Sequence, residues 1–286
     1  MFPDVLNWPL ERWVNEASDW IVVSFGPEFK ACSHIVLVAL LAVESIFRAL
    51  PWWLVISIIA AIAYHATRTW KLPLLTTLCM VFVGSLGLWD LAMQTMALVM
   101  LSVALAIIIG VPFGILLAYK EHIRPWTVPL LDAMQTMPPF VYLIPALMLF
   151  GVGKVPAVIA TVIYAIPPVV RLTDLGIRLV DQEVVEAARA FGTGPYKRLF
   201  SVDLPLALPN IMAGINQCTM LALGMVVLAS MIGARGLGEE ILYGIQRLDV
   251  GKGFAGGLAI VAIAIVLDRI TQAYGRGKSA LRENRQ

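Results

Sequence analysis

The chain has 286 residues, of which 59% are hydrophobic and only 14% are charged, a composition too apolar for a soluble globular domain. Its mean hydropathy of +0.83 predicts an all-α polytopic membrane protein, in which several helices cross a lipid bilayer. The formal net charge of +2 is uninformative as a total, and nothing in the sequence predicts a nucleic-acid partner.

The N-terminal part predicts a segment at the membrane surface followed by an ambiguous one. Residues 1–30 are amphipathic, with three tryptophans among acidic residues, which favours a helix lying at the bilayer interface. They have no basic start followed by an apolar core, so we expect no cleavable signal peptide. Residues 31–50 are apolar but contain Glu44 and Arg48, which leaves open whether they span the membrane or lie flat.

Further apolar runs predict about seven membrane spans, give or take one. They extend from Pro51 to about His65, Leu72 to Leu88, Leu91 to Tyr119, Trp126 to Phe150, Val155 to about Leu172, Ile211 to Ile232 and Phe254 to Leu267. We expect accessory spans at 31–88, a core at 89–272 and a tail at 273–286. The ionisable residues closest to the membrane interior lie near span ends, which favours interfacial anchors over a proton relay. These residues are Asp90, Asp174, Asp268 and Arg269.

The chain offers no familiar catalytic or metal-binding pattern. It lacks a Gly-x-x-x-x-Gly-Lys-Ser/Thr phosphate loop, a His-Glu-x-x-His motif, a Gly-x-Ser-x-Gly motif and paired carboxylates within its spans. Its cysteines and histidines are scattered: Cys32, Cys79, Cys218, His34, His65 and His122. We therefore expect no catalytic residue, no metal site and no cofactor bound by this chain, and we interpret the cysteines as small core hydrophobes.

A polar, helix-forming island at 184–209 separates two long apolar runs. Asp181 is placed to cap a short helix. The apolar face of that helix would comprise Val184, Val185, Ala188 and Phe191, at helical spacing. Glu186 and Arg189 lie three residues apart on the other side, where the two side chains can pair.

The second half of this island contains residues that shape turns. Gly192 suits the left-handed turn that ends a helix, and Pro195 suits the first turn of the next one. Leu204 and Pro205 should stop the pattern before the chain re-enters the membrane. A membrane protein has little reason to build such a stiff element unless a partner docks on it.

This island resembles the EAA motif of type I ATP-binding cassette importer permeases. The motif reads Glu-Ala-Ala, three residues, Gly, nine residues, an aliphatic residue, one residue and Leu-Pro. Its positions here are Glu186, Ala187, Ala188, Arg189, Gly192, Leu204 and Pro205, with Val202 where isoleucine is usual. The alternative is an ordinary solvated loop helix. The resemblance implies a permease fold with a five-helix core and a docking surface for a partner ATPase, which would use ATP and Mg.

The basic residues predict the side of the membrane that this loop faces. With the loop at 184–205 in the cytoplasm, most lysines and arginines of the loops and the C-terminal tail fall on the cytoplasmic side, as the positive-inside rule requires. Only Lys154, Arg235, Arg247 and Lys252 then face outward. We therefore expect the loop and the C-terminus to be cytoplasmic, where ATP is.

Two more segments predict a translocation path and an outer gate. Prolines inside a span free backbone carbonyls, which is tolerable only where protein or a water-filled path satisfies them. The candidate path comprises Pro138, Pro139, Phe140, Tyr142, Tyr164 and Asn216, and the alternative is a kink for packing. The candidate outer gate or binding-protein contact comprises Gly233, Arg235, Gly236, Gly238, Glu240 and Tyr243, and the alternative is a plain turn.

These segments, with 213–217 and 267–272, closely resemble the permease subunit of glycine betaine/proline-type osmoprotectant importers over about 89–271. The resemblance implies an inner-membrane complex in a prokaryote. Its parts would be two permease copies, expected to be a homodimer, two cytoplasmic ATPases and a separate extracytoplasmic binding protein. The usual substrates are betaines, choline, carnitine, proline and related methylated amines, whose cationic groups bind aromatic faces. The alternatives are a permease for ordinary amino acids or another small zwitterion, and a non-transporting membrane scaffold.

Overall fold

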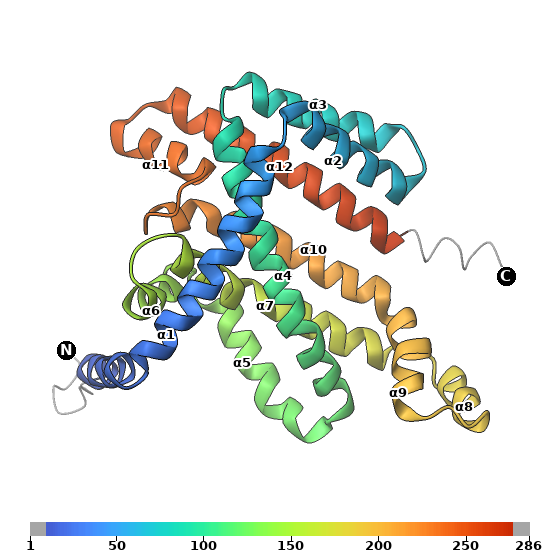
Figure 1. The fold of residues 1–286 in the computed structure, drawn as a ribbon. Helices are drawn as coiled ribbons and strands as arrows, with labels where there is room; N and C mark the ends of the chain where they lie inside the picture. Colours follow the sequence, from blue (N-terminus) through green and yellow to red (C-terminus); the bar gives the residue numbers. More distant parts are fainter. Residues whose placement is uncertain (1–9, 277–286) are drawn as a thin grey trace, which may run out of the picture.

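A computed structural model describes residues 10–276, and all regular elements in this range are helical, as predicted (Figure 1). The α-helices are α1 (Leu10–Ala49), α2 (Trp52–Thr67), α3 (Lys71–Ser85), α4 (Trp89–Tyr119), α5 (Arg124–Thr136), α6 (Phe140–Phe150), α7 (Lys154–Arg178), α8 (Gln182–Ala190), α9 (Pro195–Arg198), α10 (Leu204–Ser230), α11 (Leu237–Arg247) and α12 (Val250–Arg276). A 3-10 turn (Glu121–Ile123) precedes α5, and a π-helical turn (Leu199–Asp203) joins α9 to α10.

The number of candidate spans lies at or just below the lower limit of the expected seven, give or take one. Among the described residues, five helices are long and apolar enough to cross a membrane, or six if the bent pair α5–α6 counts as one. The expected spans at 51–65 and 72–88 form the helices α2 and α3, of only 16 and 15 residues. At 1.5 Å per residue these helices are about 22–24 Å long, whereas the bilayer core is about 30 Å thick. The chain ends α2 at Arg68, which has a left-handed backbone (φ 55).

The span expected at 126–150 is broken in its middle. Helices α5 and α6 meet at a bend of 98°. Met137 has extended dihedral angles (φ −67, ψ 135), because a residue before proline is sterically excluded from the helical region. The pair Pro138–Pro139 therefore ends one helix and begins another, instead of kinking a single span.

Helix α1 joins most of the expected surface segment at 1–30 to the apolar segment at 31–50 in one helix. It runs for 40 residues, with a kink at Phe25 (φ −117, ψ 17). Pro27 accounts for the kink, because it has no N–H to donate within the helix. Residues 1–9 of the predicted surface segment lie outside the described range, as do residues 277–286 of the tail. From Glu11 to Ala49 the helix is long and apolar enough to span a membrane.

The centre of the fold is a close packing of α4, α7 and α10. At Gly114 on α4, a Cβ atom would lie 2.6 Å from Thr173 Cβ and 2.7 Å from the Val170 carbonyl oxygen, both on α7. At Gly214 on α10, a Cβ atom would lie 3.0 Å from the Pro168 carbonyl oxygen on α7. Glycines therefore let these backbones touch, as small residues do between membrane helices.

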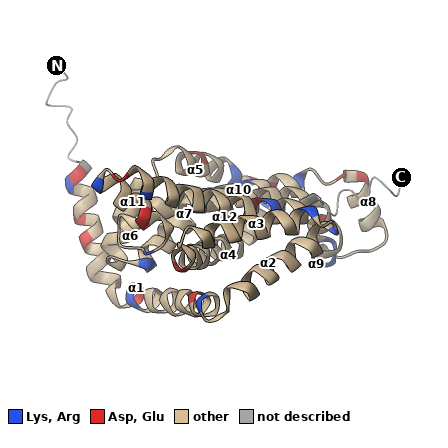
Figure 2. Cartoon of the chain, turned by 90° about the horizontal axis from the view of Figure 1, so that it is seen from above, with Lys and Arg blue, Asp and Glu red and all other residues tan. Residues whose placement is uncertain are grey.

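The remaining long helices surround this centre (Figure 1). Helices α2 and α3 form a hairpin that packs on α12, whereas α1 packs on α4 and α6. Figure 2 shows long uncharged stretches in the middle of the helices, with charged residues mainly near helix ends and along the first half of α1. The cysteines were expected to be core residues, and this holds fully only for Cys218, which is buried. Cys79 is partly exposed, and Cys32 is exposed.

The close packing predicts an asymmetry between two glycine substitutions. Gly114→Ala should lower the free energy of unfolding by about 1–3 kcal/mol, because the new methyl group overlaps α7. Gly257→Ala on α12 is the matched control, since a Cβ atom there meets nothing within 4 Å. Thermal unfolding of the purified proteins measures both. Equal melting temperatures for the two variants would contradict the packing described here.

Candidate functional site

The predicted helix–turn–helix at 181–203 is present at one end of α10, and we call this region the α8 end. Helix α8 is capped by Asp181, whose side chain accepts a hydrogen bond from the backbone N–H of Glu183 (2.9 Å). Gly192 has φ +74, and α9 begins at Pro195. The cap, the left-handed turn and the proline at the first turn are thus confirmed as features of the backbone.

The predicted apolar face of α8 is more exposed than expected. Of its predicted apolar face, Val185 is buried, but Val184 and Phe191 are 43% and 90% exposed. Tyr196 and Phe200 on the following turns are 82% and 67% exposed. Helix α8 projects from the bundle and contacts little of it besides the π-helical turn, so its apolar side chains have no core to enter (Figure 1). The α8 end therefore presents an aromatic surface.

The expected pairing within α8 is absent from the structure. Glu186 and Arg189 are both exposed, and neither has an ion pair within residues 10–276. Exposed pairs of this kind gain little, because water solvates both charges. Within the described part of the chain, both charges therefore lie on the surface of the α8 end without an ionic partner.

Leu204 and Pro205 do not stop a helix, contrary to the prediction. They lie in the first turn of α10, directly after the π-helical turn at 199–203. Proline is tolerated at this position because the first N–H groups of a helix have no partner in the helix itself. The chain thus continues into α10 seven residues before the expected start of the span at Ile211.

A group of three side chains around the buried Asp203 holds the π-helical turn against α4. Asp203 is 3% exposed, and its Oδ2 accepts hydrogen bonds from Tyr119 Oη and from Arg198 Nε, the latter at 3.1 Å. The Arg198 guanidinium carbon lies 5.5 Å from the centre of the Tyr119 ring. The position of α8 and α9 is thus linked to the end of α4. The sequence gives no sign of this group, because Tyr119 is 84 residues from Asp203.

The residues of the candidate path form two separate groups. The Tyr142 and Tyr164 rings lie 5.9 Å apart, and Tyr142 Oη donates to the Met134 carbonyl (2.6 Å) across the α5–α6 bend. This tyrosine therefore satisfies a carbonyl near the break at Pro138–Pro139. Phe140 is 49% exposed at the start of α6.

Asn216 lies in another part of the bundle. Its Nδ2 donates to Asp268 Oδ1 on α12 (2.9 Å), and its Oδ1 accepts from Thr271 Oγ1. Gln272 Nε2 donates to the same Asp268 oxygen (2.6 Å). The structure therefore assigns Asn216 to a polar contact between α10 and α12.

The candidate gate is a tight turn at 231–236, at the opposite end of α10, which we call the α11 end. Gly233 and Gly236 have φ +85 and +153, and the Leu237 N–H donates to Thr95 Oγ1 on α4 (2.8 Å). The Ile232 carbonyl accepts from the Gly153 N–H (2.9 Å). The turn is thus held between α4 and the turn that precedes α7.

The other gate residues occupy different positions around this turn. Gly238 is buried against α10, and a Cβ atom there would lie only 2.5 Å from the Val226 carbonyl oxygen. Glu240 faces Lys252, 4.0 Å away. Arg235 and Tyr243 are exposed and line a cavity of about 280 Å³ at the α11 end.

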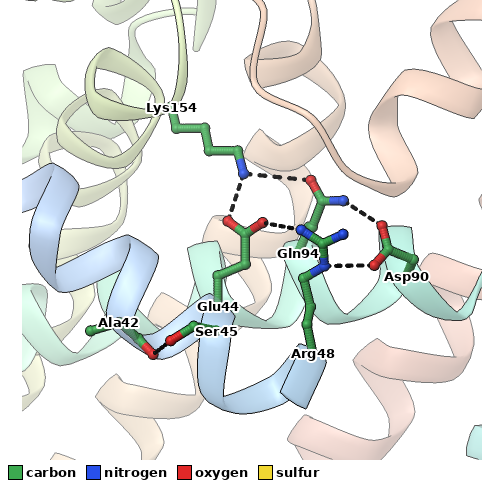
Figure 3. Close-up of polar contacts among 7 residues, drawn as sticks. All are labelled: Ala42, Glu44, Ser45, Arg48, Asp90, Gln94 and Lys154. Atoms are coloured by element: carbon green, nitrogen blue, oxygen red, sulfur yellow. Dashed lines mark hydrogen bonds and ion pairs between the residues drawn. The ribbon is translucent and has the colours of Figure 1, made fainter. Parts of the chain in front are cut away.

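A ring of charged and polar side chains near the α11 end was not predicted (Figure 3). Glu44 on α1 is 5% exposed, and its Oε2 accepts from Lys154 Nζ at the start of α7 (2.6 Å). Arg48 lies between two carboxylates, 3.5 Å from Glu44 and 2.7 Å from Asp90. Gln94 on α4 closes the ring, donating to Asp90 (2.8 Å) and facing Lys154 (3.5 Å). We call these five residues the Glu44 ring.

The Glu44 ring adjoins both contacts that hold the 231–236 turn. Gln94 precedes Thr95, and Lys154 follows Gly153. The ring therefore fixes α1 to the two elements that hold the turn. The sequence shows only the four-residue spacing of Glu44 and Arg48, because Lys154 is 110 residues from Glu44.

The expected interfacial anchors are paired with other side chains. Asp90 belongs to the Glu44 ring, and Arg269 lies 3.9 Å from Asp268. Asp174 is 4% exposed and faces Arg178 (2.7 Å) and Arg124 (3.4 Å). Among residues 10–276, no three His, Cys, Asp or Glu side chains are grouped so as to hold a metal ion.

Helix α7, the α8 end, α10 and α11 fall within residues 110–279, which match the family described as "Binding-protein-dependent transport system inner membrane component". The chain belongs to this family. It is therefore a multi-pass inner-membrane permease of a binding-protein-dependent transporter, as the resemblance implied.

Two curated relatives and one solved structure place this permease more closely. It is 46% identical to the glycine betaine/proline betaine permease ProW of Escherichia coli, over 97% of this chain and 78% of the relative. It is 43% identical to the glycine betaine/carnitine permease GbuB of Listeria monocytogenes, over 96% and 98%. A chain of the inward-facing MetNI methionine ABC transporter has a TM-score of 0.57 at 21% identity, covering 68% of this permease and 95% of that chain. The last match shows a shared fold and confirms the type I importer architecture.

The Glu44 ring predicts that a charge exchange restores stability. Glu44→Lys or Lys154→Glu alone should lower the free energy of unfolding by about 3 kcal/mol or more, because each leaves like charges in contact in a largely buried place. The double variant should recover part of the loss. The recovery is partial because Arg48 still favours a carboxylate at position 44. Thermal unfolding of the purified permease measures all three variants.

The exposed pair Arg12–Glu16, whose side chains are 79% and 61% exposed, provides the control. Glu16→Lys should cost less than about 1 kcal/mol. The ring would lose its structural role if the Glu44 and Lys154 variants cost no more than this control, or if combining them doubled the loss.

Proposed function

We propose that this permease is the membrane-spanning subunit of an ATP-driven importer of glycine betaine or a related quaternary or methylated amine. The observation that carries the proposal is the identity of 46% and 43%, over almost the whole chain, to permeases named for glycine betaine. Such amines carry a cationic group that aromatic faces bind. The half-buried pair Tyr142 and Tyr164 offers such faces within the bundle.

The energy for transport comes from a partner ATPase that docks on the α8 end. Three observations support this docking: the left-handed turn at Gly192, the exposed aromatic side chains Phe191, Tyr196 and Phe200, and the charges of Glu186 and Arg189, which have no ion pair among residues 10–276. If the ATPase covers these aromatic side chains when it docks, each of them would contribute strongly to the binding free energy. ATP and Mg are used by that ATPase, and this chain binds no cofactor of its own.

The orientation and assembly follow from the same arrangement. The α8 end is cytoplasmic, and the α11 end faces a separate extracytoplasmic binding protein. Arg68 after α2 and Lys71 at the start of α3 then join the cytoplasmic side, as the positive-inside rule favours. The translocation path lies between two copies of the permease, each with one ATPase, because the chain contains no internal repeat that could build a symmetric path alone.

Reconstitution of the complex tests the substrate class. The permease, its ATPase and its binding protein should take up glycine betaine into proteoliposomes only with ATP inside. Unlabelled methylated amines should compete with the labelled solute, and leucine should not. Uptake of leucine or a sugar without uptake of any methylated amine would overturn the substrate class and leave the permease assignment in place.

Two glycines in the α8 end offer a matched test of ATPase docking. Gly192→Leu should reduce ATP-driven uptake at least about tenfold, because a Cβ atom opposes the left-handed backbone at φ +74. Gly194→Leu places the same side chain two residues away at φ −64, which any residue adopts, and should retain most activity. Membrane insertion is checked by the yield of folded protein. Equal uptake by both variants would show that the turn at Gly192 is not needed for coupling.

A further inference from the structure

The cavity at the α11 end has a charge arrangement that the transport function does not by itself require. Its volume is about 280 Å³, and its wall includes the 231–236 turn and one face of α11. Glu239, Tyr243 and Gln246 recur at three- and four-residue spacing, which places them on the same side of that helix. The volume lies just below the about 300 Å³ at which pockets begin to hold drug-sized ligands, so it suits a smaller solute.

Two opposite charges line this cavity without neutralising each other. Arg235 comes from the turn and Glu239 from the first turn of α11, and neither has an ion pair within residues 10–276. The neighbouring Glu240 differs, because it faces Lys252 at 4.0 Å. A small solute that carries both charges would find a partner for each of them inside one cavity.

Tyr243 adds a surface for a cation. Its side chain is 41% exposed, and the Arg247 guanidinium carbon already lies 5.5 Å from the ring centre. A cation within about 6 Å of an aromatic face is attracted by the ring's electrons. The Tyr243 ring is thus already in contact with one cation, the Arg247 guanidinium. The ring also lines the cavity, where it can contact the cationic group of a bound solute.

We propose that this cavity is a transient binding site for a small zwitterion with a quaternary ammonium group. The carboxylate binds Arg235, and the ammonium group lies between Glu239 and the Tyr243 ring. The inference rests on the proposed import of methylated amines and assigns a place in the permease where such a solute is held after it leaves the binding protein.

The position of the cavity supports release as well as binding. Arg235 belongs to the turn whose Ile232 carbonyl accepts from the Gly153 N–H before α7, whereas the first residue of α11, Leu237, donates its N–H to the Thr95 hydroxyl on α4. A shift of α7 relative to α4 would therefore move Arg235 relative to Glu239 and Tyr243, which belong to α11. The site is therefore expected to lose its shape when the core helices rearrange.

Ligands with different charges provide a sharp test. Glycine betaine carries a carboxylate and a trimethylammonium group, whereas choline carries only the latter. Arg235→Gln should weaken glycine betaine binding at least about tenfold, the range of a charge-assisted hydrogen bond, and leave choline binding within about twofold. Tyr243→Leu should weaken both about three- to tenfold, and Tyr243→Phe, which keeps the ring, should weaken neither.

The measurement uses the permease–ATPase complex in lipid nanodiscs without the binding protein, titrated with radiolabelled glycine betaine or choline. Absence of saturable glycine betaine binding to the unaltered complex, or equal binding by all variants, would overturn the site. So would a loss of choline binding in Arg235→Gln as large as the loss of glycine betaine binding.

Uptake by the unaltered complex with its binding protein is measured in parallel. Normal glycine betaine uptake together with a failed binding test rejects only the site. Failure to transport any methylated amine rejects the proposed function itself.

Discussion

The close contact of α4, α7 and α10 is the constraint on which the other features depend. Gly114 and Gly214 allow backbones to touch where any side chain would overlap a neighbour. Helices in a bilayer gain little from hydrophobic exclusion, so this contact and the hydrogen bonds around it supply much of their association. Because these three helices cannot slide without separating first, the elements at their two ends keep a defined distance and orientation.

Both ends of this centre are fixed by charges that are withdrawn from water. At the α8 end, Asp203 holds Arg198 and Tyr119 together, and at the α11 end, Glu44 holds Lys154. A buried charge without a partner is costly, so each of these contacts strongly restricts the elements that carry it. The exposed aromatic surface lies beside the first of these groups, and the cavity lies beside the second. A partner or a solute that binds there therefore contacts side chains whose supporting elements are already fixed in place.

Local features were predictable from the sequence, and contacts between distant elements were not. The cap at Asp181, the turn at Gly192 and the start of α9 at Pro195 depend on a few neighbouring residues, and the structure confirms them. The exposure of Phe191 could not be read from its spacing, because the spacing shows which residues share a face and not what covers it. The ring around Glu44 joins three helices, so its partners follow only from the fold.

Errors in the expected spans have a common physical origin. Hydropathy reports apolar length but not the direction of the backbone, and prolines change that direction. Pro138 turns one apolar run into two helices at 98°, whereas Pro205 leaves a helix intact because it lies in a first turn. The same residue type thus has opposite effects, depending on whether its missing N–H was needed.

The π-helical turn at 199–203 also sets the rotation between α9 and α10. A π-helical turn contains one residue more than the α-helical turn it replaces. Each residue of an α-helix turns the chain by about 100°. Removing one residue before Asp203 would therefore rotate the α8 end by about a quarter of a revolution around the α10 axis and withdraw Arg198 from Asp203 and Tyr119. Chain length in these five residues, more than their chemistry, determines which direction Phe191 and Tyr196 face.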